Sequence, residues 1–227
     1  MFFGKKKAIT FSYDDGVVQD RRLVEILNKY GLKATFNINS ELLGTENTLN
    51  IQGKRICHNK IAPDEVASLY AGHEVAVHTL THPQLTYLDE AEIIRQVECD
   101  RENLSRLVGY DVIGMAYPGG GFQNSDRVEN VIKNHTGVKY SRTISLSYSF
   151  KRQTDVFRYK PTAYHMEFGT NYKLADEFFA ADEGIFYIWG HSYEFDINDT
   201  WAEFEKFCEY VANRPDVYYG INKEIII

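Results

Sequence analysis

The chain has 227 residues, of which 44% are hydrophobic and 25% are charged. This length and composition allow a full hydrophobic core and exclude an intrinsically disordered chain, and no linker or repeat divides residues 1–227, so we expect a single domain. The formal net charge of -7 offers no basic footprint for nucleic acid and no polybasic patch for a membrane surface.

Strand-like and helix-like segments alternate along the first half of the chain. The predicted elements are a strand at 8–13, a helix at 20–30, a strand at 34–38, a hairpin within 50–57, a short helix from Pro63, a strand at 74–77 and a long helix at 89–107. The first helix ends before Gly31, which suits the position after a helix C-terminus, and Asp89 is placed to cap the long helix.

The second half continues the alternation. The predicted elements are strands at 112–117, 138–141, 157–159, 185–190, 217–219 and 225–227, and helices at 125–134, 172–179 and 200–212. This order indicates an α/β fold with a largely parallel sheet, although periodicity alone does not separate a barrel from a doubly wound sheet.

The sequence shows neither a signal peptide nor a membrane span. Lys5, Lys6 and Lys7 are not followed by the apolar region of a signal peptide, and no apolar run approaches the length of about 20 residues that a membrane span needs. For the chain as written we therefore expect a cytoplasmic location.

Two fragments carry the chemistry. Asp14 and Asp15 follow the first strand in a strand-to-helix loop, and His78 and His82 follow the strand at 74–77, where Pro83 prevents them from lying on one helix. Two imidazoles and one carboxylate suit a catalytic Zn²⁺ or a similar ion, and a second carboxylate can act as a base. Each fragment alone also fits a turn, a helix cap or a chance pair of histidines; their conjunction favours a metal-dependent hydrolase.

These fragments resemble the motifs of the polysaccharide deacetylases, also called the NodB homology domain or carbohydrate esterase family 4. The family motif Thr-Phe-Asp-Asp-Gly matches residues 12–16, and His-Ser/Thr-x-x-His-Pro matches residues 78–83. The resemblance implies that Asp14 is the catalytic base and that Asp15, His78 and His82 bind one divalent metal ion. Zinc is the expected metal, with cobalt, nickel and manganese as alternatives.

Two later segments extend the resemblance. In residues 116–121, Gly119 takes the place of the residue whose backbone N–H binds the oxyanion, and in residues 188–191 His191 takes the place of the general acid. The family's fold implies a distorted (β/α)-barrel of about seven strands that is not fully closed.

The chain departs from the family at two motifs. Ala116 stands where many relatives have an arginine that orients the catalytic aspartate, and we hypothesise that Arg142 supplies this charge. The fourth motif, Asp-x-x-Asp-Trp, is not recognisable. Tyr117, Arg142 and His165 are candidate substrate-binding residues, whereas His58 is expected to be structural or exposed to solvent.

The resemblance predicts hydrolysis of acetyl groups on an N- or O-acetylated oligo- or polysaccharide. Two alternatives remain open: a related metal-dependent amidase acting on a small amide or ureide, and a non-catalytic carbohydrate-binding descendant that has kept the pocket.

Overall fold

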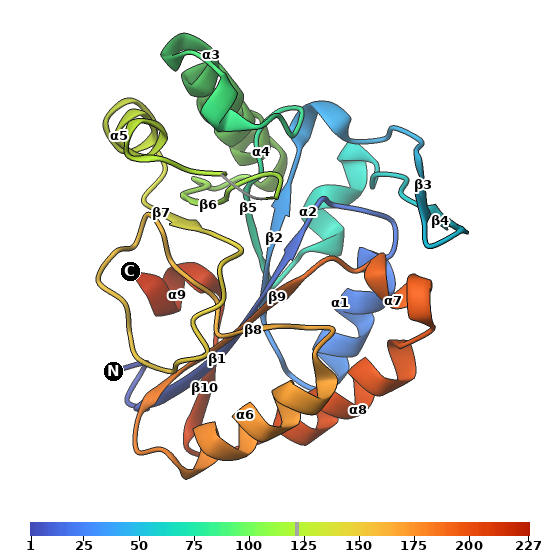
Figure 1. Cartoon of the computed structure of the whole chain (residues 1–227), viewed down its shortest axis with the longest axis vertical. Coiled ribbons are helices and arrows are strands. Elements are labelled where there is room, and N and C mark those ends of the chain that lie inside the picture. Colours follow the sequence, from blue (N-terminus) through green and yellow to red (C-terminus); the bar gives the residue numbers. More distant parts are fainter. Residues whose placement is uncertain (121–122) are drawn as a thin grey trace.

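A parallel sheet forms the centre of the protein (Figure 1). The computed structural model describes residues 1–120 and 123–227. The strand order is β7-β6-β5-β2-β1-β9-β8, with β10 paired to β1, and every pairing in this sheet is parallel. The strands are β1 (Lys7–Asp14), β2 (Ala34–Ile38), β5 (Glu74–Val77), β6 (Gly114–Ala116), β7 (Tyr140–Arg142), β8 (Ala163–Tyr164), β9 (Gly184–Gly190) and β10 (Val217–Tyr219).

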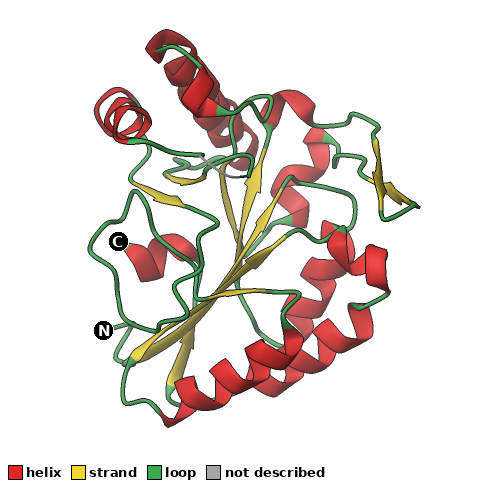
Figure 2. Ribbon diagram, in the orientation of Figure 1, coloured by secondary structure: helices red, strands yellow, loops and turns green. Residues whose placement is uncertain are grey.

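Helices follow most of these strands and pack around the sheet (Figure 2). They are α1 (Asp20–Lys29), α2 (Val66–Leu69), α3 (Glu90–Ile94), α4 (Asp100–Val108), α5 (Asp126–His135), α6 (Phe168–Ala180), α7 (Glu194–Asn198), α8 (Trp201–Val211) and α9 (Asn222–Ile226). A π-helical segment, Arg95–Cys99, joins α3 to α4, so that one helical rod runs from residue 90 to residue 108. None of the helices within the described residues is both long and apolar enough to span a membrane.

Strand β1 shows how the sheet separates two environments. Alternate side chains of a strand point to opposite faces. Ile9, Phe11 and Tyr13 join the large core beneath the helices, whereas Ala8 belongs to a second, smaller cluster that includes Ile225 and Ile226 of α9. The same face of β1 ends at Asp14, so the polar site lies at the C-terminal end of the face that α9 covers.

The sheet curls into an incomplete barrel, as predicted. Strands β7 and β8 are the two ends of the strand order and do not pair with each other. Helix α9 lies on the side where the barrel is open (Figure 1), and the hydroxyl of Thr10 in β1 donates a hydrogen bond of 2.9 Å to Oδ1 of Asn222 in α9. The C-terminal helix therefore fills part of the interior that strand pairing leaves unclosed.

Most predicted elements are present with shifted ends. The hairpin consists of β3 (Thr48–Ile51) and β4 (Lys54–Cys57), and the side chain of Asp89 caps α3 by accepting a hydrogen bond from the backbone N–H of Glu92. The helix predicted at 172–179 begins four residues earlier, at Phe168. Strand β8 and helix α7 were not predicted. Gly121, the last residue of the segment 116–121, lies outside the described residues.

Two predicted strands are wrong. Ile225 and Ile226 form the end of helix α9, and Ile227 follows it. The side chain of Glu224 accepts a hydrogen bond from the backbone N–H of Ile221 and so stabilises the first turn, while Ile225 and Ile226 are buried. Residues 157–159 form no strand, and only Tyr159 makes an isolated parallel bridge, with Arg142. In both segments the tertiary contacts override the β-propensity of the residues.

The turn after Asp15 provides a stability test. Gly16 has φ +61°, and a Cβ atom there would lie 2.8 Å from Cγ2 of Ile38. Gly16→Ala should therefore cost about 1–2 kcal/mol for the left-handed backbone and a further 1–3 kcal/mol for overpacking. Gly53→Ala is the matched control, because Gly53 has φ +77° with no atom near the added Cβ. Equal losses in urea unfolding for the two variants would contradict the packing argument.

Candidate active site

A cavity of about 270 Å³ opens at the C-terminal ends of the central strands. Loops at this end of parallel strands converge, which is why catalytic groups of (β/α)-barrels gather there. The lining residues are Asp14, Asp15, His78, His82, Tyr117, Gly119, Gly120, Ile144, Trp189, His191 and Tyr193. The structure thus brings together the predicted base, acid, oxyanion residue and metal ligands.

Asp15, His78 and His82 form a group with the geometry of a metal site. One ligand atom of each lies within 4.8 Å of the others, with the Nε2 atoms of His78 and His82 at 3.8 and 3.7 Å from Oδ1 of Asp15. Burial lowers the pKa of His78 to about 4 and also lowers that of His82, so both imidazoles are neutral at neutral pH. Nδ1 of His78 lies 2.9 Å from the carbonyl oxygen of Ala116, which directs Nε2 towards the cluster.

The backbone at these ligands is strained. Asp15, Thr79 and His82 have φ values of +82°, +69° and +61°. Non-glycine residues in this region cost energy and persist where surrounding contacts hold them. The amide of Asn39 donates hydrogen bonds to the carbonyl oxygens of His78 and Thr79, at 2.6 and 2.9 Å. The side chain of Asn39, which follows the neighbouring strand β2, therefore holds the histidine loop.

The π-helical segment Arg95–Cys99 also supports the histidine loop. The backbone carbonyl of Gln96, within this segment, accepts a hydrogen bond of 3.0 Å from the N–H of Leu80. Its side-chain oxygen accepts another, at 3.2 Å, from the N–H of Thr81. A wider helical turn frees backbone groups for such contacts, and π-turns occur often beside functional sites.

Asp14 is held by a buried arginine. Nη2 of Arg142 lies 2.5 Å from both carboxylate oxygens of Asp14, and both side chains are almost fully buried. The amide of Asn37 donates a further hydrogen bond of 2.8 Å to Oδ1. Burial raises the pKa of Asp14, but the charge of Arg142 and its hydrogen bond, together with the interactions with His78 and His191, outweigh burial, and the pKa lies below its ordinary value.

The position of Arg142 is related to the departure at Ala116. Ala116 in β6 and Arg142 in β7 are register partners on adjacent parallel strands. The guanidinium therefore reaches Asp14 from one strand further along the sheet, and it packs against the ring of Trp189 with its Cζ 4.8 Å from the ring centroid. This geometry agrees with the hypothesis that Arg142 supplies the missing charge.

His191 lies beside the carboxylate of Glu194. Nδ1 of His191 is 3.3 Å from Oε2 of Glu194, which also accepts a hydrogen bond from the backbone N–H of His191. Burial lowers the pKa of His191, but the hydrogen bond and charge of Glu194, together with the charges of Asp15 and Asp14, outweigh burial and raise the pKa to about 9. The imidazole is therefore protonated at neutral pH. Glu194 follows His191 by three residues in sequence, in a part of the chain where no family motif pointed to it.

The three candidate substrate-binding residues, Tyr117, Arg142 and His165, are all buried, and only Tyr117 is among the residues that line the cavity. Tyr117 lines the cavity but is only 1% exposed, and Arg142 lies beneath Asp14. His165 does not line the cavity, contrary to its assignment as a substrate contact: it is 1% exposed, and its Nε2 lies 2.7 Å from Oε2 of Glu194. Its neighbours Tyr13 and Phe195 fill the space around its ring.

Sequence analysis missed three contacts of the two aspartates. Asn37, opposite Asp14 in the register of β1 and β2, is a polar residue at the end of an apolar strand, which was a usable signal. His58 and Lys60 follow the hairpin and contact Asp15, with His58 Nε2 at 3.2 Å from Oδ2 and Lys60 Nζ at 2.7 Å from the backbone oxygen. Nothing in their spacing indicated these contacts. His58 was expected to be structural or exposed to solvent, and its contact with Asp15 was not predicted.

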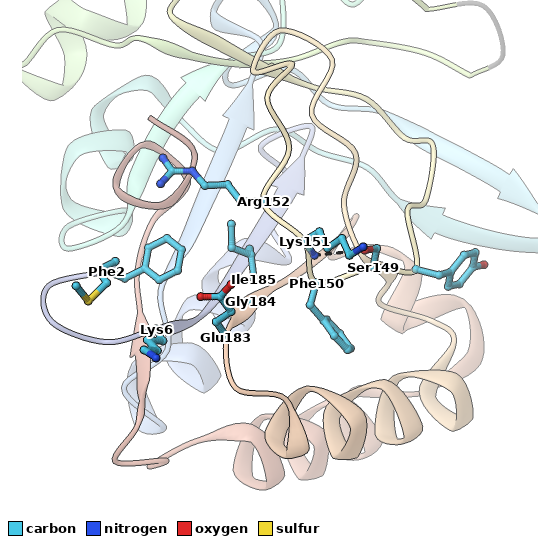
Figure 3. A pocket seen from close by; sticks show the side chains of 11 residues that line it. Phe2, Lys6, Ser149, Phe150, Lys151, Arg152, Glu183, Gly184 and Ile185 are labelled. Atoms are coloured by element: carbon cyan, nitrogen blue, oxygen red, sulfur yellow. Dashed lines mark hydrogen bonds between the residues drawn. The ribbon is translucent and has the colours of Figure 1, made fainter.

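A larger cavity, of about 730 Å³, lies at the opposite end of the sheet (Figure 3). It is lined near the start of β9 by Phe2, Lys6, Phe150, Arg152 and Glu183, among others. It contains neither the histidines nor the paired aspartates of the smaller cavity. Its size therefore does not make it the better candidate for the active site.

The buried pair of Asp14 and Arg142 predicts non-additive stability. Arg142→Met leaves the Asp14 carboxylate buried without its partner charge, which should cost about 3–5 kcal/mol of unfolding free energy. The double variant Asp14→Asn/Arg142→Met should lose less than the sum of the single losses, because neither charge is then stranded. Urea unfolding of the four proteins measures this coupling, and additive losses would show that the pair is not coupled.

The contact with Glu194 predicts the titration of His191. In the metal-free protein, the imidazole should remain protonated up to about pH 9, and Glu194→Gln should move its midpoint to lower pH, because a negative neighbour is removed. NMR titration of the histidine ring signals measures this midpoint. Glu167→Gln is the control, since Glu167 contacts Tyr148 instead. A midpoint unchanged in Glu194→Gln would contradict the assigned pairing.

Known structures share this fold at low sequence identity. A Mycobacterium smegmatis protein assigned to the polysaccharide deacetylases has a TM-score of 0.68 at 16% identity, over 98% of this chain and 90% of that one. The family 4 carbohydrate esterase from Streptomyces lividans, in complex with acetate, has a TM-score of 0.57 at 15% identity, over 96% and 92%. A family 4 pseudoenzyme from Bacillus anthracis has a TM-score of 0.56 at 19% identity, over 98% and 66%.

These identities establish a common fold and leave the activity open, particularly since a pseudoenzyme is among the neighbours. No curated protein sequence matches the chain. The family model described as polysaccharide deacetylase matches residues 4–141, which include Asp14, Asp15, His78, His82 and Gly119. With a match over more than half of its length, this chain belongs to the polysaccharide deacetylase family.

Proposed function

We propose that the protein is a metal-dependent hydrolase that removes acetyl groups from an N- or O-acetylated carbohydrate. The observation that carries the proposal is the convergence of Asp14, Asp15, His78, His82 and His191 on one cavity. A protein that only binds sugar has no need of a base and an acid beside a metal site. This argues for catalysis in spite of the pseudoenzyme among the structural neighbours.

Asp15, His78 and His82 would hold the metal ion. One carboxylate and two neutral imidazoles fit zinc, and three protein ligands leave a coordination position open, as catalytic sites require. The pKa of Asp15 lies well below its ordinary value: burial raises it, but the hydrogen bond with His58, the charge of Lys60 and the interactions with His191 and His78 together outweigh burial. When bound, a divalent ion supplies Lewis acidity, which lowers the pKa of water to about 7 in favourable sites and polarises a carbonyl.

Asp14 is the proposed base. It accepts a proton from the water molecule whose oxygen attacks the acetyl carbon. Its lowered pKa keeps it ionised at neutral pH but also makes it a weak base, so it is effective only towards a water that is itself acidified. Arg142 and Asn37 hold the carboxylate in one orientation, which avoids the entropic cost of ordering it during the reaction.

Two further residues are assigned to the oxyanion and to the leaving group. We assign the backbone N–H of Gly119 as a donor to the oxyanion that develops on the acetyl oxygen. Gly119 has φ +81°, which would strain any other residue, and a Cβ atom there would lie 2.8 Å from Oε1 of Gln84, so that the Gln84 side chain would have to move. His191, protonated beside Glu194, donates its proton to the sugar nitrogen or oxygen as the bond to the acetyl carbon breaks.

The lining and the volume of the cavity indicate which substrates it could accept. Trp189 and Tyr193 contribute aromatic rings to its wall, and such rings suit the apolar faces of sugars. Its volume of about 270 Å³ is small, which keeps a metal-dependent amidase of small amides or ureides as the second candidate.

Acetate release is the experiment that separates these functions. The metal-depleted protein is incubated with a panel of N-acetyl and O-acetyl saccharides, with and without Zn²⁺ or Co²⁺, and small ureides are tested in parallel. Metal-dependent acetate release supports the deacetylase. Release from ureides alone would favour the amidase, and metal binding without any turnover would favour a non-catalytic descendant.

Replacing Asp14 tests the assignment of the base. Asp14→Asn should retain metal, because Asp14 is not among the three ligands, and should lose about 10²–10⁴-fold in kcat. Metal content and acetate release are measured on the same preparation. Retained turnover would contradict the assignment of the base, whereas loss of metal would mean that Asp14 helps to form the metal site.

A further inference from the structure

The segment that follows the β3–β4 hairpin lies directly against the first aspartate loop. Val17 and Lys60 form an isolated antiparallel bridge, and the N–H of Ile61 donates to the carbonyl oxygen of Gly16 at 3.0 Å. The N–H of Val18 donates to the carbonyl oxygen of Asn59 at 2.9 Å. These backbone bonds fix the segment 58–61 beside the loop that carries Asp15.

Two side chains of this segment contact Asp15 at different atoms. Nζ of Lys60 donates a hydrogen bond of 2.7 Å to the backbone oxygen of Asp15, whose φ of +82° needs such support. Nε2 of His58 lies 3.2 Å from Oδ2. Oδ1, the other carboxylate oxygen, is the atom that lies near Nε2 of His78 and of His82. Oδ2 of Asp15 is thus held by His58, whereas Oδ1 faces the metal site and also lies 3.8 Å from Nζ of Lys60.

We propose that His58 is a positioning residue of the metal site: it holds Oδ2 of Asp15 so that Oδ1 faces the two imidazoles. The His58 side chain is about one-tenth exposed, and its ring packs edge-on against that of Tyr193, with centroids 4.9 Å apart. Its Nδ1 has no hydrogen-bond partner among the described residues, so the contact with Asp15 is the polar contact that its buried ring makes. Groups that orient a ligand typically contribute about 10–100-fold to metal affinity.

The proposal rests on the metal site of the proposed function, and the test uses metal affinity instead of turnover. Zn²⁺ affinity of the metal-free full chain is measured by competition with a chromophoric chelator, and the absorption spectrum of the Co²⁺-loaded protein reports the ligand geometry. His58→Phe keeps a ring against Tyr193 but removes the donor. His58→Gln places an amide N–H near the position of Nε2.

His58→Phe should bind Zn²⁺ about 10–100-fold more weakly than the wild type and should change the Co²⁺ spectrum. His58→Gln should recover most of the affinity. Arg55→Ala, an exposed change on the same hairpin, is the control and should leave both readouts unchanged. The thermal midpoint of each metal-free variant monitors the fold.

Two outcomes would overturn the proposal while leaving the metal site intact. Wild-type affinity in His58→Phe would show that the contact with Oδ2 does not position Asp15. Equal weakening in His58→Phe and His58→Gln would show that packing matters and the donor does not. Failure of the wild type itself to bind Zn²⁺ or Co²⁺ would instead contradict the metal site of the proposed function, and the inference with it.

Discussion

A buried arginine is tolerated in this fold because its charge is matched by the carboxylate that the chemistry requires. Arg142 is fully buried, and Nη2 lies 2.5 Å from both oxygens of Asp14. Removing either charge from water is expensive, and the cost is recovered only while the two remain in contact. Strands β1 and β7, which carry the two residues, are therefore fixed relative to each other although three strands separate them in the sheet.

The same constraint explains how the site can lack the arginine that many relatives have at position 116. Adjacent parallel strands place their residues side by side, so Ala116 and Arg142 both end at the same edge of the sheet. A long side chain from β7 reaches the position that a side chain from β6 would otherwise fill. His191 is also paired with an opposite charge: Glu194, only three residues further along the chain, provides its negative partner.

The sequence was most informative where local pattern and chemistry coincide. Asp14, Asp15, His78 and His82 follow clear strands, so their convergence followed from the rule that parallel strands end at one edge. His58 and Glu194 depend on how a hairpin and a short helix fold back, and periodicity contains no information about such contacts. His165 was assigned to the substrate as a polar residue that could line the cleft and contact sugar hydroxyls, but tertiary packing buries it against Glu194. The terminal isoleucines form a helix because capping and burial outweigh their β-propensity.

Zinc-dependent acetate release by the wild type and by Arg142→Met, each with its fold and zinc content verified, tests the account most directly. We predict that the wild type releases acetate from an acetylated saccharide only when zinc is present. Arg142→Met should keep zinc, because the three ligands are untouched, and should lose about 10²-fold or more in kcat, since Asp14 is no longer held as a base. Turnover by Arg142→Met at the wild-type rate, or acetate release without metal, would contradict the account.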